Sequence, residues 1–431
     1  MSPNTNTSDV NIDGTIHHTW LIEPTPSSKN NKHSNSGVLT DQGIENIANH
    51  QYKPGQYTYL DNVLNPIWTA LTELLPIWLA PNMVTFIGAL HCGVAYGVTW
   101  YYSSNFDQTV PNWVVFLNGY CTIAYYTFDC MDGKQARRTK QSSPLGQLFD
   151  HGFDCLCNLA HISCQAGGYL LLGGTYYFMA FQGSLFFAFF MAQWEEYYTG
   201  ELPHAMGNFG VTETNYGLGL FAIYNSFLGK HGREQLWTSL IGDINPIQSI
   251  LQQISIHYTI PTYILSMELK QFGISCWFIA SIVLVLGSLY RVLTHEKVTT
   301  NKLWYSAISK LITPFLIACG PFILPWHVIQ TETRSISICM GLLMSYLTMK
   351  MICFSMAKQT YASIQIEAIP YWFVLVWIRY DTNITNRGAT ILLSVLCFFY
   401  TYKLISWSKS AIHQITTRLD INCFTIKHKK V

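Results

Sequence analysis

From residue 83 onward, long apolar runs alternate with shorter polar segments along the chain. About 20 helical residues cross the hydrocarbon core of a bilayer, so each of these runs predicts a transmembrane helix. The polar segment 230–269 predicts a long loop, with or without an interfacial helix inside it. The pattern as a whole predicts an all-α, polytopic membrane protein with about ten transmembrane helices. The predicted spans are residues 83–104, 111–131, 147–172, 175–195, 212–229, 270–291, 303–324, 335–356, 363–379 and 388–407.

The segment just before the first span has the periodicity of a helix with one apolar face. Between Leu60 and Trp78 the apolar residues recur mostly at intervals of three and four. The opposite face carries Asp61, Asn62, Asn65, Thr72 and Glu73. Such a helix either lies on a membrane surface or packs as an ordinary helix against the protein. We predict the first arrangement, with residues 53–82 forming the interfacial helix and the start of the first span.

Composition agrees with a membrane protein. Charged residues make up 11% of the chain, against roughly 25% in an ordinary soluble domain. Aromatic residues reach 15%, and the mean hydropathy is positive. The formal net charge is +1, which gives no electrostatic basis for binding nucleic acid. Residues 1–52 are rich in Asn, Ser, Thr and His and predict a disordered cytosolic tail.

Basic residues predict the orientation in the membrane, because cytosolic loops are enriched in Lys and Arg. The connection between the second and third spans is strongly basic, whereas residues 104–110 carry no Lys or Arg. Residues 409–431 form a basic tail. These segments predict cytosolic N- and C-termini and a cytosolic connection after the second span, although five basic residues favour the opposite side. Those five are Lys230, Arg233, Arg334, Arg379 and Arg387.

Four aspartates stand at the predicted cytosolic ends of the second and third spans. Asp129 and Asp132 are three residues apart, and Asp150 and Asp154 are four apart, so each pair projects from one face of its helix. The two helices are joined by a short link and must run antiparallel, which lets both pairs converge. Converging carboxylates repel one another unless divalent cations cancel the charge, and oxygen ligands suit Mg²⁺ or Mn²⁺. We therefore predict two metal ions here, an arrangement that serves in-line displacement at phosphorus.

The residues around the aspartates fit a bound nucleotide. Gly133 and Ala136 have almost no side chain, so a flat nucleotide can lie against their helix. Arg137 can hold phosphate oxygens with its forked guanidinium. Gly146 stands one turn before Asp150 and is expected to let the two helices approach closely.

The segment that carries the four aspartates resembles the signature of a known family. It resembles the CDP-alcohol phosphotransferases at every fixed position of their signature, which here reads Asp129-x2-Asp132-Gly133-x2-Ala136-Arg137-x8-Gly146-x3-Asp150-x3-Asp154. Within that family it is most similar to the eukaryotic choline/ethanolamine phosphotransferase group. The similar stretches are DGKQARRT at 132–139, PLGQLFDHG at 144–152, WLAPNMVTFIG at 78–88 and, more loosely, AQWEEYYTGEL at 192–202 with VTE at 211–213. The similarity in layout covers about residues 40–425, and in the C-terminal half it rests on hydropathy and a few positions.

The resemblance implies transfer of phosphocholine or phosphoethanolamine from CDP-choline or CDP-ethanolamine to the hydroxyl of diacylglycerol, with release of CMP. It implies that the four aspartates hold two Mg²⁺ or Mn²⁺ ions. Asn82 would join Gly133, Ala136, Arg137 and Gly146 in the nucleotide site. His151 is the expected catalytic base, since it stands among the metal ligands and titrates near neutral pH. Asp154 has that role in the wider family, and His151 is alternatively a residue that orients Asp150.

The head group of the donor is a cation, which aromatic rings and carboxylates recognise. Candidates are Trp194, Tyr197 and Tyr198, with Glu195, Glu196 and Glu213 nearby in sequence. Aromatic residues also gather at membrane interfaces for unrelated reasons.

The resemblance also divides the chain. Residues 83–229 would form the catalytic helices, and residues 230–408 would line the route of diacylglycerol from the bilayer and supply contacts of a homodimer. The group resides in endoplasmic reticulum or Golgi membranes. The terminal KHKKV is similar to a dilysine retrieval signal for the endoplasmic reticulum, or is a basic tail near anionic lipid.

Two other functions compete with this one. A related enzyme with inositol or glycerol phosphate as acceptor is the nearer alternative, although such enzymes have about six spans and need basic residues for a phosphorylated acceptor. A lipid transporter or scramblase would distribute its charges along a pathway and repeat its halves in inverted topology. The acids of this chain cluster at one membrane face instead, and no repeat is visible.

Overall fold

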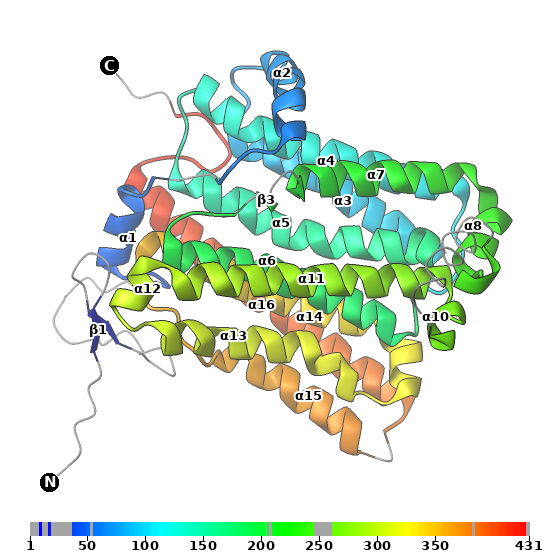
Figure 1. Ribbon diagram of the computed structural model, residues 1–431. Helices are drawn as coiled ribbons and strands as arrows, with labels where there is room; N and C mark the ends of the chain where they lie inside the picture. The colour runs from blue at the N-terminus through cyan, green and yellow to red at the C-terminus, as the bar shows by residue number, and fades with distance from the viewer. Residues whose placement is uncertain are drawn as a thin grey trace, which may run out of the picture.

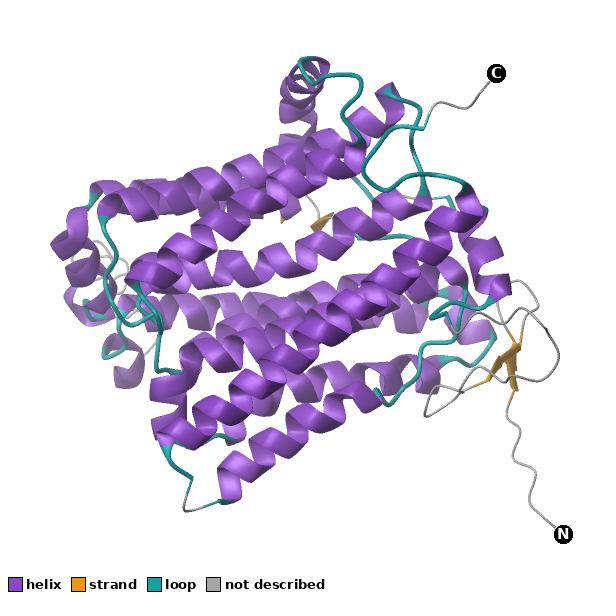
Figure 2. Ribbon diagram, turned by 180° about the vertical axis from the view of Figure 1, so that it is seen from behind, coloured by secondary structure: helices purple, strands orange, loops and turns teal. Residues whose placement is uncertain are grey.

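The computed structural model describes residues 8–10, 16–18, 37–51, 55–203, 205–206, 209–244, 261–381 and 384–427. Long helices lie side by side in a bundle (Figure 1), and the described part is almost entirely helical (Figure 2), as predicted. The helices are α1 (Asp41–Ala48), α2 (Tyr59–Glu73), α3 (Pro81–Tyr102), α4 (Asn112–Arg138), α5 (Pro144–Gln165), η1 (Ala166–Leu170), α6 (Tyr176–Thr199), α7 (Val211–Phe227), α8 (Gly229–Thr238), η2 (Ile241–Asp243), α10 (Thr262–Leu265), α11 (Leu269–Thr294), α12 (Glu296–Thr300), α13 (Trp304–Cys319), η3 (Gly320–Ile323), α14 (Trp326–Ala357), η4 (Ile366–Ala368), α15 (Ile369–Tyr380) and α16 (Asn386–Leu419). The strands form two antiparallel pairs, β1 (Ser8–Val10) with β2 (Ile16–His18) and β3 (Ala205–Met206) with β4 (Phe209–Gly210).

Each predicted span overlaps one of the long helices. Among the described residues, five helical stretches are long and apolar enough to cross a membrane. They are Pro81–Tyr102, Leu269–Thr294, Trp304–Ile323, Trp326–Ala357 and Asn386–Leu419. Of the others, α7 has 17 residues and α15 has 12, and α4 and α5 carry the polar groups of the aspartate region. The chain therefore has the helices of a membrane protein, and the full set of ten spans remains a prediction.

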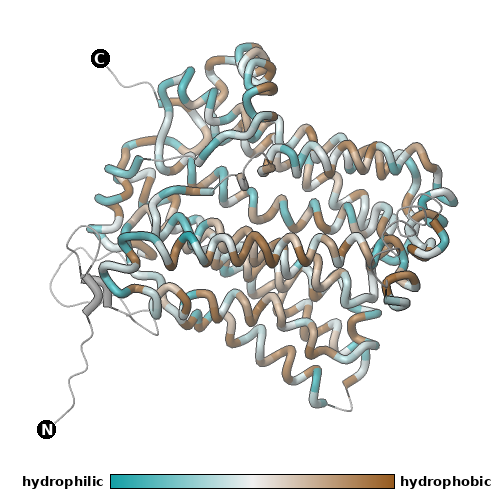
Figure 3. The backbone as a smooth tube through the Cα atoms, in the orientation of Figure 1, coloured by the Kyte–Doolittle hydropathy of each residue, from teal (hydrophilic) through white to brown (hydrophobic). Residues whose placement is uncertain are grey.

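The long helix α14 lies at the centre of the bundle. Of its most apolar window, 89% is buried inside the protein, and it packs against α5, α6, α16 and α1. In contrast, the corresponding window of α11 is 17% buried. Its residues are among the most hydrophobic of the molecule (Figure 3). Apolar side chains of α11 therefore face outward, as expected where a helix borders lipid.

Two glycines bring α4 and α7 into close contact. A Cβ atom added at Gly119 would lie 2.5 Å from the carbonyl oxygen of Gly219 and 2.9 Å from the amide nitrogen of Ile223. Both are backbone atoms, which a small side-chain rotation cannot move away. Helices of a membrane protein approach closely where small residues face each other, and α7 is thereby held against the helix that carries Asp129.

We expect Gly119→Ala to destabilise the protein by about 1–3 kcal/mol, because the extra methyl forces the two helices apart. The measurement is the midpoint of thermal denaturation in detergent. Gly97→Ala on α3 is the matched control, since an added Cβ there has no neighbour within 4 Å. Equal midpoints for the two variants would contradict the close α4–α7 contact.

The prediction of a disordered tail up to residue 52 was wrong for its last part, because part of this segment is helical. Residues 41–48 form α1, capped by the Thr40 side chain, which accepts a hydrogen bond from the amide of Gly43. Leu39 and Ile47 are buried in the main core. The few apolar residues of this segment share one face, and that face is enough to dock the helix on α14 and α16. Most of residues 1–36 lies outside the described residues, as do residues 428–431 of the KHKKV pattern.

The predicted amphipathic helix corresponds to α2, which projects from the upper side of the bundle in Figure 1. Thr58 and Asp61 form a capping box at its start. Its apolar residues Val63 and Ile67 are exposed, as is Trp78 beyond its end, whereas Trp68 is buried. The helix is thus both anchored to the bundle and open on an apolar side, and its contact with a membrane surface remains a prediction. In the 230–269 segment, the described residues include the short helices α8 and α10.

Candidate active site

Helices α4 and α5 bring three of the four aspartates together. The link between them ends at Ser143, whose side chain caps α5, and Pro144 occupies the first turn of that helix, where a missing N–H is tolerated. Carboxylate oxygens of Asp129, Asp132 and Asp150 all lie within 4.8 Å of one another. Asp154 is not part of this group of three, but with Asp129 it lines an adjoining cavity.

Two hydroxyl groups that sequence reasoning missed hold these carboxylates in place. The Thr85 hydroxyl of α3 donates a hydrogen bond to Asp132 Oδ2, and the buried Tyr125 hydroxyl donates to Asp154 Oδ1. Tyr125 is one turn before Asp129 on α4, so helical spacing could have predicted that it lies near the aspartates. Thr85 could have been found in the same way, because it follows Asn82 at an interval of three residues and therefore shares its helix face.

The aspartate group fits a divalent cation. Asp129 Oδ1 and Asp150 Oδ1 are buried and have no hydrogen-bond partner within the described part of the chain. Leaving anionic oxygens buried and unpaired is costly, and a hard cation with oxygen ligands removes that cost. The residues present therefore suit Mg²⁺ or Mn²⁺.

A polar cavity of about 450 Å³ opens on one side of the aspartates. Its walls include all five residues predicted to bind nucleotide, which are Asn82, Gly133, Ala136, Arg137 and Gly146, together with Asp132, Asp150 and His151. Gly146 lines this cavity, but the expectation that it lets α4 and α5 approach closely was wrong. An added Cβ there would have its nearest neighbours at 4.0 Å, so Gly146 borders the cavity and is not a point of tight helix contact.

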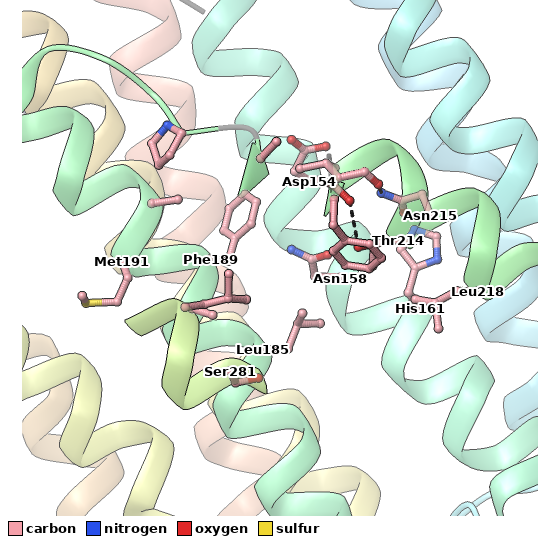
Figure 4. A pocket seen from close by; sticks show the side chains of 18 of the residues that line it. Asp154, Asn158, His161, Leu185, Phe189, Met191, Thr214, Asn215, Leu218 and Ser281 are labelled. Atoms are coloured by element: carbon pink, nitrogen blue, oxygen red, sulfur yellow. Dashed lines mark hydrogen bonds between the residues drawn. The ribbon is translucent and has the colours of Figure 1, made fainter. Parts of the chain in front are cut away.

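A second cavity of about 280 Å³ opens on the other side and is mainly apolar. Asp129, Asp154 and Tyr125 stand at its wall, and α6, α7 and α11 supply most of the rest. Figure 4 shows Asp154 and Asn158 of α5 on one side of this cavity, with Leu185 and Phe189 of α6 on another. The aspartates therefore stand between a polar and an apolar cavity.

His151 lies beside the aspartates on α5. Its Nε2 atom is 3.8 Å from Asp150 Oδ2, and the residue is 7% exposed. It lines the polar cavity, whereas Asp154 lines the apolar one. Both candidates for the base are thus placed at the aspartate group, on opposite sides of it.

The predicted head-group residues are not brought to the aspartates as a set. The Trp194 side chain is fully buried, and its indole N–H donates to the Ala307 carbonyl of α13 at 3.0 Å. The Tyr197 hydroxyl donates to the Gln359 carbonyl at 3.2 Å. Glu213 accepts from the Gly210 amide at 2.8 Å and caps the start of α7. Trp194 and Tyr197 therefore stabilise the packing of α6 against other segments, and Glu213 stabilises the start of its own helix.

Glu195 has a different place from its neighbours. It lines the apolar cavity, where its carboxylate accepts two hydrogen bonds from Arg291, at 2.6 and 2.9 Å, and one from Ser288 at 2.5 Å. This charge pair, between the buried Glu195 and the exposed Arg291, joins α6 to α11 at the cavity wall. With both oxygens occupied, Glu195 is satisfied without a cationic ligand.

Comparison with known proteins connects this geometry to a family. Residues 78–242 match the family described as CDP-alcohol phosphatidyltransferase. Over 407 residues the chain is 28% identical to choline/ethanolaminephosphotransferase 1 of Arabidopsis thaliana, an alignment that covers 91% of this chain and 100% of that protein. It is 27% identical over 422 residues to cholinephosphotransferase 1 of Saccharomyces cerevisiae, covering 91% and 98% of the two chains.

A shorter alignment gives higher identity. The chain is 32% identical over 191 residues to cholinephosphotransferase 1 of Danio rerio, which covers 43% of this chain and 48% of that protein. The matched domain contains α4 and α5 with all four aspartates. Because the domain match, the full-length similarity and the aspartate geometry agree, residues 78–242 are identified as a CDP-alcohol phosphatidyltransferase domain.

Proposed function

We propose that this chain is an integral membrane phosphotransferase that moves phosphocholine or phosphoethanolamine from a CDP-alcohol to the hydroxyl of diacylglycerol. CMP is released, and phosphatidylcholine or phosphatidylethanolamine is formed. The observation that carries the proposal is the aspartate group between two cavities of opposite character. A charged nucleotide suits the polar cavity, and acyl chains suit the apolar one, so the reacting groups meet at the carboxylates.

On the donor side, the chain's own residues bind and orient the CDP-alcohol. Gly133 and Ala136 offer a flat helix surface to the nucleoside, and Arg137 binds phosphate oxygens with its guanidinium. Asn82 also lines this cavity and offers its side-chain amide. When bound, two Mg²⁺ or Mn²⁺ ions held by Asp129, Asp132, Asp150 and Asp154 supply positive charge that stabilises the leaving CMP.

On the acceptor side, a base takes the proton of the diacylglycerol hydroxyl. The freed oxygen attacks the phosphorus that carries the alcohol, and the bond from this phosphorus to the oxygen of CMP breaks in line. We favour His151 as the base because its imidazole lies beside the aspartates, and imidazole is the side chain most often used to accept a proton in catalysis. Asp154 is the alternative, and its place on the apolar cavity supports that role.

The apolar cavity supports a lipid acceptor over a phosphorylated one. Its wall includes one Arg, and that guanidinium is already bound to Glu195. An inositol or glycerol phosphate acceptor would need cationic groups left available for its charge. Diacylglycerol would reach the cavity sideways from the bilayer, past α11, whose outward face is apolar.

We further propose a cellular arrangement. The ten predicted spans cross the membrane of the endoplasmic reticulum or Golgi, α2 lies on the membrane surface, and the aspartates face the cytosol. Residues 83–229 form the catalytic part, and residues 230–408 line the lipid route and contribute to a homodimer. The basic tail that begins at residue 409 is cytosolic. Hydropathy and the distribution of Lys and Arg support this arrangement.

The proposal is tested by following CMP release from purified protein with diacylglycerol, Mn²⁺ or Mg²⁺, and either CDP-choline or CDP-ethanolamine. We expect release that depends on diacylglycerol and is abolished by EDTA. Filling the apolar cavity with Ala188→Trp is expected to raise the KM for diacylglycerol severalfold, because acyl chains lose room, while the KM for the CDP-alcohol stays unchanged.

Ala280→Trp is the matched control, since Ala280 is exposed on α11 and does not line the cavity. Absence of CMP release from both donors would overturn the proposed reaction. An unchanged KM for diacylglycerol in Ala188→Trp would contradict the place assigned to the acceptor.

A further inference from the structure

A segment near each end of the chain lies at or beside the polar cavity, although neither belongs to the matched domain at residues 78–242: the N-terminal one lines the cavity, and the C-terminal one contacts Asn82 in its wall. Residues 37–51, with α1, pack against α14 and α16 and deliver His50 to the cavity wall. At the other end, Asp420 adopts a left-handed conformation with φ of 53°, which turns the chain back after α16. Residues 421–424 then lie against α3 and α5. We name residues 37–51 together with residues 414–424 the terminal clasp.

The two halves of the terminal clasp are bonded to each other. The Gln414 side chain donates to the Leu39 carbonyl at 3.0 Å and accepts from the Leu39 amide at 3.1 Å. Arg418 and Glu45 form an ion pair at 2.6 Å. Pairing of a backbone amide and carbonyl with one side-chain amide fixes the relative position of the segments. The N-terminal and C-terminal segments therefore form one unit beside the cavity.

The C-terminal half of the clasp sets the orientation of Asn82. The Asn82 Nδ2 atom donates to the Cys423 carbonyl at 2.9 Å. This turns Asn82 Oδ1 to the side of Gly146, whose added Cβ would lie 4.0 Å from it. The Phe424 ring anchors the segment, with ring centroids 5.4 Å from Phe149 and 6.4 Å from Phe86. Asn82 thus presents an acceptor, and not a donor, to the cavity.

The N-terminal half acts in the same way through Gln147, which stands one turn before His151 on α5. The Gln147 Nε2 atom donates to Glu196 Oε1 at 3.0 Å, and Gln147 Oε1 lies 2.9 Å from His50 Nε2. Since the amide nitrogen is used by the carboxylate, the amide oxygen must accept from His50 Nε2. The Nε2 atom of His50 then carries the proton, and Nδ1 keeps its lone pair.

The environment of His50 keeps this neutral form at physiological pH. Burial lowers the pKa of His50 below its ordinary value, the hydrogen bond with Gln147 opposes this, and the charge of Lys358 lowers the pKa further. A neutral imidazole with a free Nδ1 lone pair accepts a hydrogen bond. It suits an amino or hydroxyl group and not a phosphate oxygen.

We propose that His50 is a nucleoside-binding residue, held in place by the terminal clasp and by the Gln147–Glu196 pair, and that it accepts a hydrogen bond from the nucleoside of the CDP-alcohol. The inference rests on the proposed function, because it needs a nucleotide in the polar cavity with its phosphates at the aspartates. The cavity extends from Asp132 and Asp150 to His50, so a nucleotide anchored at the carboxylates directs its nucleoside to the clasp. The amino group of cytosine and the ribose hydroxyls are the available donors.

The test is the dissociation constant of CMP, measured by calorimetry on the full chain in detergent with Mn²⁺, beside the KM values for CDP-choline and diacylglycerol. We expect His50→Ala to weaken CMP binding and to raise the KM for CDP-choline about tenfold, the worth of one buried hydrogen bond. The KM for diacylglycerol is expected to stay unchanged.

His50→Gln separates ligand binding from packing. A Gln side chain can still donate to Gln147 at the place of Nε2, but it has no acceptor at the place of Nδ1. We therefore expect His50→Gln to bind CMP as weakly as His50→Ala. Wild-type affinity in His50→Gln would overturn the proposal and leave His50 a packing role. His413→Ala, at an exposed histidine of α16, is the matched control.

The role of the C-terminal half of the terminal clasp is tested by a separate variant. Phe424→Ala removes the anchor of the segment that orients Asn82, and we expect weaker CMP binding with an unchanged KM for diacylglycerol. Unchanged CMP binding in both His50→Ala and Phe424→Ala would overturn a role of the terminal clasp.

The wild-type chain separates failure of the reaction from failure of this inference. If it binds CMP but releases none from a CDP-alcohol, the proposed reaction fails, while the role of His50 is still measured by CMP binding. If the wild-type chain does not bind CMP, both fail.

Discussion

Asp129→Ala is expected to lower the rate of diacylglycerol-dependent CMP release by about 10³-fold or more, because the loss of a metal ligand removes several kcal/mol of charge stabilisation in the transition state. Asp129 Oδ1 is buried without a hydrogen-bond partner in the described part of the chain, and the residue lines the apolar cavity next to Asp132 and Asp150, which line the polar one. Truncation to Ala therefore removes a group that nothing nearby replaces. The measurement is single-turnover CMP release at saturating donor.

The same variant is expected to bind Mn²⁺ more weakly, which can be measured without turnover. Asp107→Ala is the matched control, since Asp107 is exposed in the connection between α3 and α4, at the other end of these helices. A wild-type rate in Asp129→Ala would contradict the metal site. A lost rate with unchanged Mn²⁺ affinity would instead place Asp129 in contact with substrate.

His151→Ala is expected to lower kcat by about 10²- to 10⁴-fold, the usual effect of removing a positioned general base. The imidazole is almost fully buried and 3.8 Å from Asp150, so water has little room to replace it in a defined geometry. The KM for the CDP-alcohol is expected to change little. His327→Ala, at an exposed histidine of α14, is the matched control.

A metal titration separates a base from a residue that orients Asp150. Loss of an orienting partner weakens metal binding by about 10- to 100-fold, a defect that excess metal repairs. If His151 is the base, saturating Mn²⁺ leaves the rate of His151→Ala low. Recovery at high Mn²⁺ would assign the orienting role to His151, and Asp154→Asn would then be expected to show the larger loss of kcat.

Much of the fold was readable because it depends on local spacing. Asp129 with Asp132, and Asp150 with Asp154, share helix faces by the geometry of the helix itself, and a short link with Pro144 forces the two helices to run antiparallel. Gly133, Ala136 and Arg137 of α4 and Gly146 of α5 line one cavity for the same reason, whereas Asn82 of α3, which the resemblance implied, reaches that cavity through the packing of α3. The positions of the long helices followed from hydropathy, although hydropathy does not say which of them are surrounded by protein.

Predictions failed where the outcome depended on a distant partner. Trp194 sits next to Glu195 in sequence, yet one side chain is enclosed against α13 and the other reaches the apolar cavity, because adjacent helical residues point in different directions. The segment around α1 looked disordered because it has few apolar residues, and its docking depends on α14 and α16, which are about 300 or more residues away.

The sequence by itself determined the helical class, the places of the long helices, and the convergence of aspartates on one pair of neighbouring helices. These follow from side-chain periodicity and from links too short to allow another arrangement. Only the tertiary structure decided that the aspartates separate a polar from an apolar cavity, that Thr85 and Tyr125 hold their carboxylates, and that the two chain ends meet beside the nucleotide residues. Such features depend on contacts between residues far apart in the chain, and no local pattern specifies which distant surface a helix face will bury.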